Sequence, residues 1–171
     1  YYLDASNEEY PGVMLAGCER IIGDKTYFFM SSGAMRAGWY SENGSWYYYD
    51  DHTGQIVSGW KKVGNTWYYM DPSNHNKMVS NGWKKLGSQW YFFNANGSMR
   101  TNWTLMNGLW YYFGSDGAAR TGWKVIGGNW YYMDDSGARV NNCWYWIGTN
   151  CYYFNENGEM AADAWIGDWY V

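Results

Sequence analysis

Aromatic and polar residues alternate along the chain in short segments that are separated by glycine, asparagine and serine. In one such segment the dipeptide Gly64-Asn65 favours a two-residue hairpin loop of type I′ or II′, which needs positive φ angles. A loop there sets three cross-strand pairs: Val63 with Thr66, Lys62 with Trp67, and Trp60 with Tyr69. Because side chains alternate between the faces of a strand, Trp60, Trp67 and Tyr69 share one face. Lys61 and Tyr68 project from the other face.

This hairpin pattern repeats along nearly the whole chain. From Trp39 to Trp165, tryptophan returns at the first hairpin position with spacings of 21, 23, 20, 20, 21 and 21 residues. Seven residues after each of the first six, a triplet begins whose second and third residues are aromatic. Turn-forming dipeptides lie between the two positions: Asn43-Gly44, Gly64-Asn65, Gly87-Ser88, Asn107-Gly108, Gly127-Gly128 and Gly148-Thr149. An isolated hairpin is marginally stable in water, so consecutive units must stack. We therefore expect an all-β fold, a solenoid of β-hairpins with repeats of about 20 residues.

The repeats divide a single repeat domain that covers residues 1–171. A partial repeat is expected at 1–16, because Tyr1-Tyr2-Leu3-Asp4 is similar to Tyr68-Tyr69-Met70-Asp71. A degenerate repeat follows at 17–37, where Glu19 and Thr26 replace both tryptophans. The complete repeats span 38–58, 59–81, 82–101, 102–121, 122–142 and 143–163, and a truncated repeat spans 164–171. Because the chain begins inside a repeat, we expect it to be a piece of a longer protein.

Composition narrows the kind of core and the kind of partner. Tryptophan, tyrosine and phenylalanine number 14, 19 and 6, against 18 leucine, isoleucine and valine residues together, so aromatic rings must do most of the burying. Only 12 Lys and Arg stand against 16 Asp and Glu, without a basic run, which argues against nucleic acid as a partner. No stretch of 18 apolar residues is present, so we expect no membrane insertion. Three cysteines without CxxC spacing and only two histidines predict neither a disulfide framework nor a metal site.

Five consecutive hairpins carry tryptophan at both paired positions. Packing between repeats would explain aromatic residues there, but it would equally tolerate Leu, Ile or Val, and none of these replaces a tryptophan. Two tryptophans and an aromatic residue of the next hairpin would form a three-walled box that attracts cations, above all quaternary ammonium groups. Aromatic faces also stack on sugar rings, so a carbohydrate ligand stays open. A connector residue could close the floor of each box, from a column of Met35, Ile56, Met78, Met99 and Met160 that Ala119 and Arg139 interrupt.

The pattern Gly-Trp-x(3–4)-Gly-x-x-Trp-Tyr-Tyr-x-(Asp/Asn)-x-x-Gly-x-Met resembles the choline-binding, or cell-wall-binding, repeats of Gram-positive bacteria and their phages. The resemblance extends from Tyr1 to at least Ala162. It implies a left-handed superhelix with choline sites between consecutive hairpins. It also implies an extracellular module at the bacterial cell surface, which holds choline-decorated teichoic or lipoteichoic acid beside a separate catalytic or adhesive domain. Related repeats of glucosyltransferases and clostridial toxins bind glucans or oligosaccharides, which keeps a glucan as the alternative ligand.

Carried over to this sequence, each expected box takes two tryptophans and the last triplet aromatic of the following repeat. The five expected boxes are Trp39, Trp46 and Tyr69; Trp60, Trp67 and Phe92; Trp83, Trp90 and Tyr112; Trp103, Trp110 and Tyr132; and Trp123, Trp130 and Tyr153. Met78 and Met99 are the expected floor residues. Trp144 should lack a full box because Cys151 replaces its partner, and the repeat with Glu19 and Thr26 should lack one too.

Three functions stay open: a choline-binding module for wall attachment, a glucan- or oligosaccharide-binding module, and a structural spacer without a small-molecule ligand. We expect no enzyme, no catalytic residue and no cofactor. The adjacent carboxylates Asp50-Asp51 and Asp134-Asp135 follow the triplets, where acidic residues recur as turn formers. The sequence does not indicate an oligomeric state.

Overall fold

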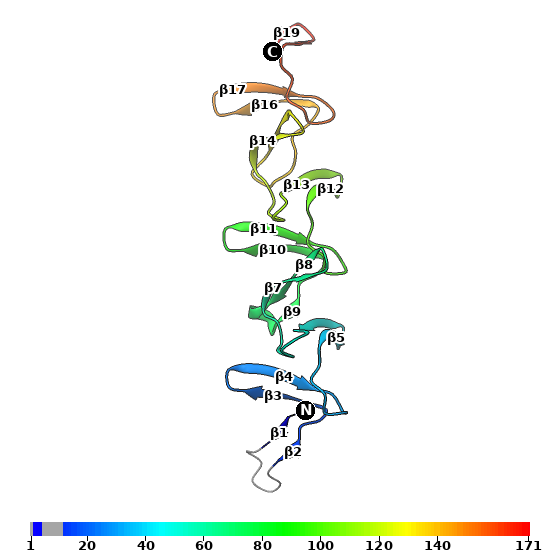
Figure 1. Cartoon of the computed structure of the whole chain (residues 1–171). Coiled ribbons are helices and arrows are strands. Elements are labelled where there is room, and N and C mark those ends of the chain that lie inside the picture. Colours follow the sequence, from blue (N-terminus) through cyan, green and yellow to red (C-terminus); the bar gives the residue numbers. More distant parts are fainter. Residues whose placement is uncertain (1, 5–11) are drawn as a thin grey trace. The chain divides into compact units, whose positions relative to one another are not determined.

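The computed structural model describes residues 2–4 and 12–171, and it consists almost entirely of β-hairpins (Figure 1). It falls into two compact units, Tyr1–Gly82 with Asn94–Ser98 and Trp83–Phe93 with Met99–Val171. Within the partial repeat expected at 1–16, residues 1 and 5–11 lie outside the described residues. Among the described residues the helical element is a short 3-10 turn, η1 (Pro72–Asn74). None of the described helical structure is long and apolar enough to cross a membrane.

Each hairpin forms its own small sheet, and successive hairpins within a unit point in different directions (Figure 1). The strand pairs up to the first long connector are β1 (Leu3–Asp4) with β2 (Val13–Met14), β3 (Cys18–Ile22) with β4 (Lys25–Phe29), β5 (Gly38–Glu42) with β6 (Ser45–Tyr49), and β7 (Gly59–Val63) with β8 (Thr66–Asp71), which also pairs with β9 (Lys77–Met78). The later pairs are β10 (Gly82–Leu86) with β11 (Gln89–Phe93), β12 (Asn102–Met106) with β13 (Leu109–Phe113), β14 (Gly122–Ile126) with β15 (Asn129–Met133), β16 (Cys143–Ile147) with β17 (Asn150–Phe154), and β18 (Trp165–Ile166) with β19 (Trp169–Tyr170). The predicted all-β hairpin solenoid is confirmed.

The hairpin register follows the loops that the sequence predicts. Across the loop Gly64-Asn65 the pairs are Val63 with Thr66, Lys62 with Trp67, and Trp60 with Tyr69. Gly64 has a φ of 59°, whereas at Asn43-Gly44 both loop residues have positive φ, 49° and 75°. Glycine and asparagine adopt these conformations at low cost, so the loop dipeptide determines which side chains face each other.

Three connectors in the second unit join their own hairpins to the hairpins before them. Ala119 forms a β-bridge with Phe113 of its own hairpin, and its N–H donates to the carbonyl oxygen of Trp90 at 2.8 Å. The next two connectors repeat both contacts. Arg139 bridges to Met133 and its N–H donates to the carbonyl oxygen of Trp110 at 2.7 Å. Met160 bridges to Phe154 and its N–H donates to the carbonyl oxygen of Trp130 at 2.8 Å. Backbone hydrogen bonds therefore hold neighbouring repeats together in addition to side-chain packing.

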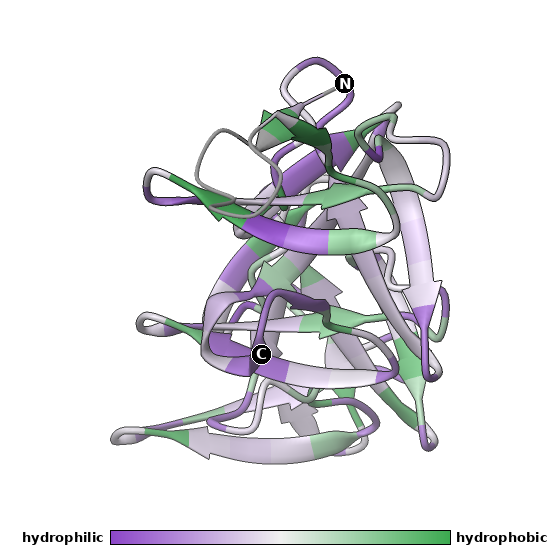
Figure 2. Cartoon of the chain, turned by 90° about the horizontal axis from the view of Figure 1, so that it is seen from below, coloured by the Kyte–Doolittle hydropathy of each residue, from purple (hydrophilic) through white to green (hydrophobic). Residues whose placement is uncertain are grey.

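In each unit the residue that follows an aromatic triplet belongs to the buried core. The largest fully buried side chains all hold this position: Phe29, Met70, Phe93, Phe113, Met133 and Phe154. The second tryptophans are much more exposed, 46% for Trp46 and 48% for Trp130. Coloured by hydropathy, the strands in Figure 2 are mostly pale, because tryptophan and tyrosine lie near the middle of that scale. The core thus relies on Phe and Met, and the tryptophan faces are left accessible.

Candidate ligand-binding sites

The paired tryptophans form two walls at nearly right angles. The rings of Trp39 on β5 and Trp46 on β6 have centroids 6.3 Å apart and an interplanar angle of 84°. Three further pairs share this geometry: Trp60–Trp67 (6.2 Å, 86°), Trp83–Trp90 (6.4 Å, 87°) and Trp123–Trp130 (5.9 Å, 85°). The register produces it, because Trp39 lies opposite Tyr48 and Trp46 lies opposite Ser41, which makes the two tryptophans diagonal neighbours on one face.

A tyrosine of the next hairpin forms a third wall. The ring of Tyr68 on β8 lies 4.8 Å from that of Trp39, with an interplanar angle of 72°. Equivalent contacts join Trp83 to Tyr111 (5.4 Å), Trp103 to Tyr131 (5.0 Å), and Trp123 to Tyr152 (4.9 Å). In every case the third wall is the middle residue of the aromatic triplet.

The third wall in the structure differs from the one predicted from the sequence, which is the last residue of the triplet. Tyr69 packs against Trp60 of its own hairpin at 5.1 Å, because the register pairs these two residues on one face. The other predicted residues also pack within their own hairpins: Phe92 on Trp83 (5.4 Å), Tyr112 on Trp103 (5.0 Å), Tyr132 on Trp123 (5.3 Å) and Tyr153 on Trp144 (5.4 Å). The alternation of side chains along β8 puts Tyr68 and Tyr69 on different faces of the hairpin, with Tyr69 on the face of its own tryptophans. This alternation is the sequence signal that favours Tyr68 over Tyr69 as the third wall. The box predicted from Trp60, Trp67 and Phe92 draws on both units and stays a prediction.

The site at Trp39 and Trp46 is a cavity of about 290 Å³. Its lining consists of Trp39, Trp46, Tyr68, Met78, Ala95 and Asn96. Met78, an expected floor residue, therefore lies in this cavity. A glycine of the following turn makes room for its side chain, since a Cβ atom at Gly97 would lie 2.3 Å from the sulfur of Met78. Among the described residues, none that lines this cavity carries a charge.

The site at Trp83 and Trp90 is larger, about 510 Å³, and more polar. Ala119 holds the position that Met78 holds in the first cavity, so a much smaller side chain lies at the floor. The rest of the lining is Ser88, Gln89, Thr121, Asp135, Ser136 and Gly137. The other expected floor residue, Met99, packs against the turn glycine Gly117, whose Cβ atom would lie 2.2 Å from the methionine sulfur. The smaller of the two cavities thus has a methionine at the connector position, and the larger one an alanine.

The degenerate repeat has a cavity at the equivalent position but lacks tryptophan walls. This cavity of about 450 Å³ contains Glu19 and Thr26, which replace the tryptophans, together with Tyr47 and Ile56 in the positions of the third wall and the floor. At the other end of the chain, Cys151 lies opposite Trp146, as the loop at Gly148-Thr149 predicts. Cys18, Cys143 and Cys151 are free thiols.

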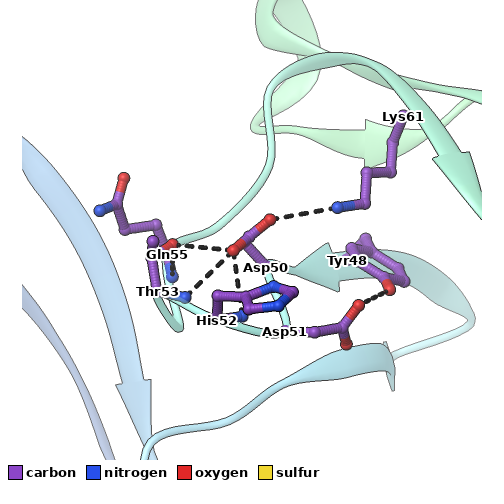
Figure 3. A network of polar contacts seen from close by, with 7 residues as sticks. All are labelled: Tyr48, Asp50, Asp51, His52, Thr53, Gln55 and Lys61. Carbon is purple, nitrogen blue, oxygen red and sulfur yellow. Dashed lines mark hydrogen bonds and ion pairs between the residues drawn. The ribbon is translucent and has the colours of Figure 1, made fainter.

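The carboxylates after the triplets support turns (Figure 3). Asp50 accepts hydrogen bonds from the backbone N–H groups of His52 (3.1 Å) and Thr53 (3.0 Å), and from Lys61 Nζ at 3.1 Å. These hydrogen bonds, above all that from Thr53, hold the pKa of Asp50 well below its ordinary value. Asp51 accepts a hydrogen bond from the Tyr48 hydroxyl. Among the described residues, no group of three or more His, Cys, Asp and Glu side chains could hold a metal ion.

Two models of known protein families match this chain. A family model described as choline-binding repeat matches residues 15–59, 80–119 and 100–144, which is more than half of the chain. A second model, described as putative cell wall binding repeat, matches residues 58–73 and 144–160. The chain therefore belongs to the choline-binding repeat family. Its hairpins with their connectors are cell-wall-binding repeats with clustered aromatic side chains.

Solved structures agree with this assignment. The chain is similar to CbpJ from Streptococcus pneumoniae TIGR4, with 32% identity, a TM-score of 0.80, and coverage of 90% of this chain and 55% of that one. It is also similar to choline binding protein F from Streptococcus pneumoniae, solved in the presence of a peptidoglycan analogue, with 36% identity, a TM-score of 0.74, and coverage of 84% and 51%. A third similar structure is the pneumococcal cell wall endolysin from phage Cp-1 complexed with choline (34% identity, TM-score 0.50, coverage of 73% and 37%). The chain spans about half the length of the first two proteins. A comparison with curated protein sequences gave no match.

Proposed function

We propose that this chain is a non-catalytic module that holds choline groups of teichoic and lipoteichoic acids on the bacterial cell surface. The observation that carries the proposal is the cavity at Trp39, Trp46 and Tyr68, which is walled by aromatic rings on three sides and has no charged residue in its lining among the residues that the structure describes. A quaternary ammonium group has no N–H to satisfy and is attracted to the negative faces of aromatic rings, so it suits such a cavity.

The number of sites compensates for the weakness of each one. A single cation–π contact contributes about 0.5–2 kcal/mol, so a small box reaches millimolar affinity, about −4 kcal/mol. Several boxes that engage one polymer raise the overall affinity by about 10²–10⁴ without new contacts. The repeats therefore act together on a polymer that carries many choline groups.

The endolysin from phage Cp-1 supports this proposal, because its structure was solved with choline. The match between the two covers 73% of the present chain, with 34% identity. Membership of the choline-binding repeat family supports it as well. The match to the cell wall binding repeat and the similarity to the pneumococcal proteins support an extracellular location at the surface of a Gram-positive cell.

A glucan or another oligosaccharide is the second candidate ligand, and the cavity at Trp83 and Trp90 favours it. Here the two aromatic faces are accompanied by polar side chains, including Asp135 and Ser136, that can hydrogen-bond to sugar hydroxyls. The larger volume of this cavity, about 510 Å³, also suits a sugar ring better than the cavity at Trp39 does.

Titration with choline and with isomaltooligosaccharides separates the two candidates. Millimolar choline should change the tryptophan fluorescence and raise the melting temperature, because a ligand that binds only the folded state stabilises it. Trp46→Ala should weaken the response. Trp146→Ala is the matched control, because this tryptophan is 69% exposed and lies opposite Cys151 rather than a second tryptophan.

The results decide between the functions as follows. A response to isomaltooligosaccharides but not to choline would overturn the choline proposal in favour of the glucan. A response to neither ligand would leave the structural spacer. Co-sedimentation with choline-substituted teichoic acid, but not with the same polymer carrying ethanolamine, tests the polymer and its cationic group together.

A further inference from the structure

Arg139 holds the connector position that methionine occupies in most repeats. Its backbone makes the standard contacts of that position, a β-bridge with Met133 and an N–H donated to the carbonyl oxygen of Trp110. Its side chain passes over the next turn glycine as Met78 does, since a Cβ atom at Gly158 would lie 2.5 Å from Nε of Arg139. The side chain therefore enters the site at the place where other sites have their floor.

The guanidinium group of Arg139 lies over the rings of both tryptophans of that site. Its central carbon is 5.6 Å from the ring centroid of Trp103 and 5.7 Å from that of Trp110. Tyr131, at 5.0 Å from Trp103, supplies the third wall. Distances below about 6 Å are those of cation–π contacts, so Arg139 makes two of them with the walls of one box.

Three further observations show that the group fills the site. Trp110 is only partly exposed, whereas its equivalents are more accessible, for example Trp90 at 47%. Burial lowers the pKa of Arg139 from its ordinary value, although an arginine remains charged. One terminal nitrogen of Arg139 donates to the carbonyl oxygen of Glu156 at 3.4 Å, which anchors the far end of the side chain.

We infer that Arg139 occupies the cation position of the site formed by Trp103, Trp110 and Tyr131, so that this site stays closed to choline at concentrations that fill the site at Trp39. This inference rests on the proposed function. Choline can enter only when the guanidinium group has left, because two cations cannot share one box. The affinity is then reduced in proportion to the fraction of molecules whose site is open.

The connector position holds a different side chain in each of three sites. Met78 lines the cavity at Trp39 and Trp46, the small Ala119 lines the cavity at Trp83 and Trp90, and Arg139 brings a cation to the site at Trp103 and Trp110. A long hydrophobic side chain can serve as a floor, but a long cationic side chain becomes a tethered competitor. Tethering makes the effective concentration of this competitor high and constant.

The test compares choline stoichiometry in the wild-type chain and in Arg139→Met, by equilibrium dialysis with radiolabelled choline. Arg139→Met should gain one choline site per chain, with an affinity about tenfold or more above that of the closed site. Adding Trp110→Ala to Arg139→Met should abolish the gained site. Arg120→Met is the matched control: it removes one positive charge from an exposed ion pair with Asp116 (2.8 Å) and should leave the stoichiometry unchanged.

The outcomes separate this inference from the proposed function. If the wild-type chain binds choline and folded Arg139→Met binds no more of it, the inference is overturned and the proposed function stands. If neither chain binds choline, the proposed function is overturned, and the inference with it. Should Arg139→Met fail to fold, wild-type crystals soaked in choline give the answer. Choline at Trp39 with the guanidinium group retained over the rings of Trp103 and Trp110 supports the inference, and choline at those two rings overturns it.

Discussion

Replacing Tyr68 by leucine tests the geometry of the site at Trp39 directly. The ring of Tyr68 lies 4.8 Å from that of Trp39 and lines the same cavity, so the substitution removes one of three aromatic walls. Leucine keeps an apolar group there but has no negative ring face. One lost cation–π wall corresponds to about 0.5–2 kcal/mol, so the affinity of this site for choline should fall by about 2- to 30-fold.

The assay must report on this site alone, because other sites also take up choline under the proposal. Incorporation of 5-fluorotryptophan gives separate ¹⁹F resonances, and those of Trp39 and Trp46 are assigned by single substitutions. Their shifts during a choline titration then give the affinity of this site in each variant. The unfolding transition of each variant, followed by circular dichroism, shows that the chain is folded under the conditions of the titration.

Tyr69→Leu is the control for this experiment. It removes the neighbouring ring, which packs against Trp60 of its own hairpin, and should change the affinity of the site at Trp39 by less than about twofold. The reasoning is refuted if Tyr69→Leu weakens this site more than Tyr68→Leu does, or if Tyr68→Leu leaves the affinity unchanged.

Three further predictions concern the size, the packing and the pH dependence of the structure. Ala119→Met should narrow the cavity at Trp83 and Trp90 from about 510 Å³ towards the 290 Å³ of the site that contains Met78. Its affinity for choline should then rise and its affinity for bulkier quaternary ammonium ions should fall, and calorimetry measures both. Gly97→Ala should lower the free energy of unfolding by about 1–3 kcal/mol in urea titrations, because its φ is 80° and the added Cβ would lie 2.3 Å from the sulfur of Met78. Burial and the hydrogen bond to Asp51 raise the pKa of Tyr48 to about 12, above the unfolded value of 10.0, so stability present below pH 10 should be lost as the pH rises to 12, measured by urea midpoints at each pH.

Matched variants separate the causes in these experiments. Gly108 also has a φ of 80°, but a Cβ atom there meets nothing within 4 Å, so Gly108→Ala should cost only the backbone strain. An equal loss in Gly97→Ala would contradict the proposed clash. Asp51→Asn removes the neighbouring negative charge and should reduce the alkaline loss of stability, and an unchanged pH profile would show that Asp51 does not contribute to it. Ala119→Ser adds no bulk and should leave the size preference of the cavity as it is.

The hairpins were predictable because short-range chemistry determines them. Gly64-Asn65 and its counterparts require particular φ angles, and the loop then sets the pairing of Trp60 with Tyr69. The third wall was harder to predict, since Tyr68 and Tyr69 are both aromatic. The alternation of faces assigns Tyr69 to the face of its own Trp60, but the contact of Tyr68 with the preceding repeat follows from the stacking of the hairpins. The sequence showed that Arg139 interrupts a column of methionines, but not where its side chain goes. Its path over Gly158 to Trp110 depends on three consecutive repeats.

The strict register of each hairpin has a genetic consequence. Side chains alternate with a period of two residues, so inserting a single codon within β5 would turn one tryptophan of the pair away from the other and destroy the box. Duplicating or deleting a whole repeat has a different effect, because the new junction brings together the same loop, connector and ring positions as the old one. Recombination between the similar repeats can therefore lengthen or shorten this array. Every junction between neighbouring repeats still has a loop, a connector position and ring positions in the same register.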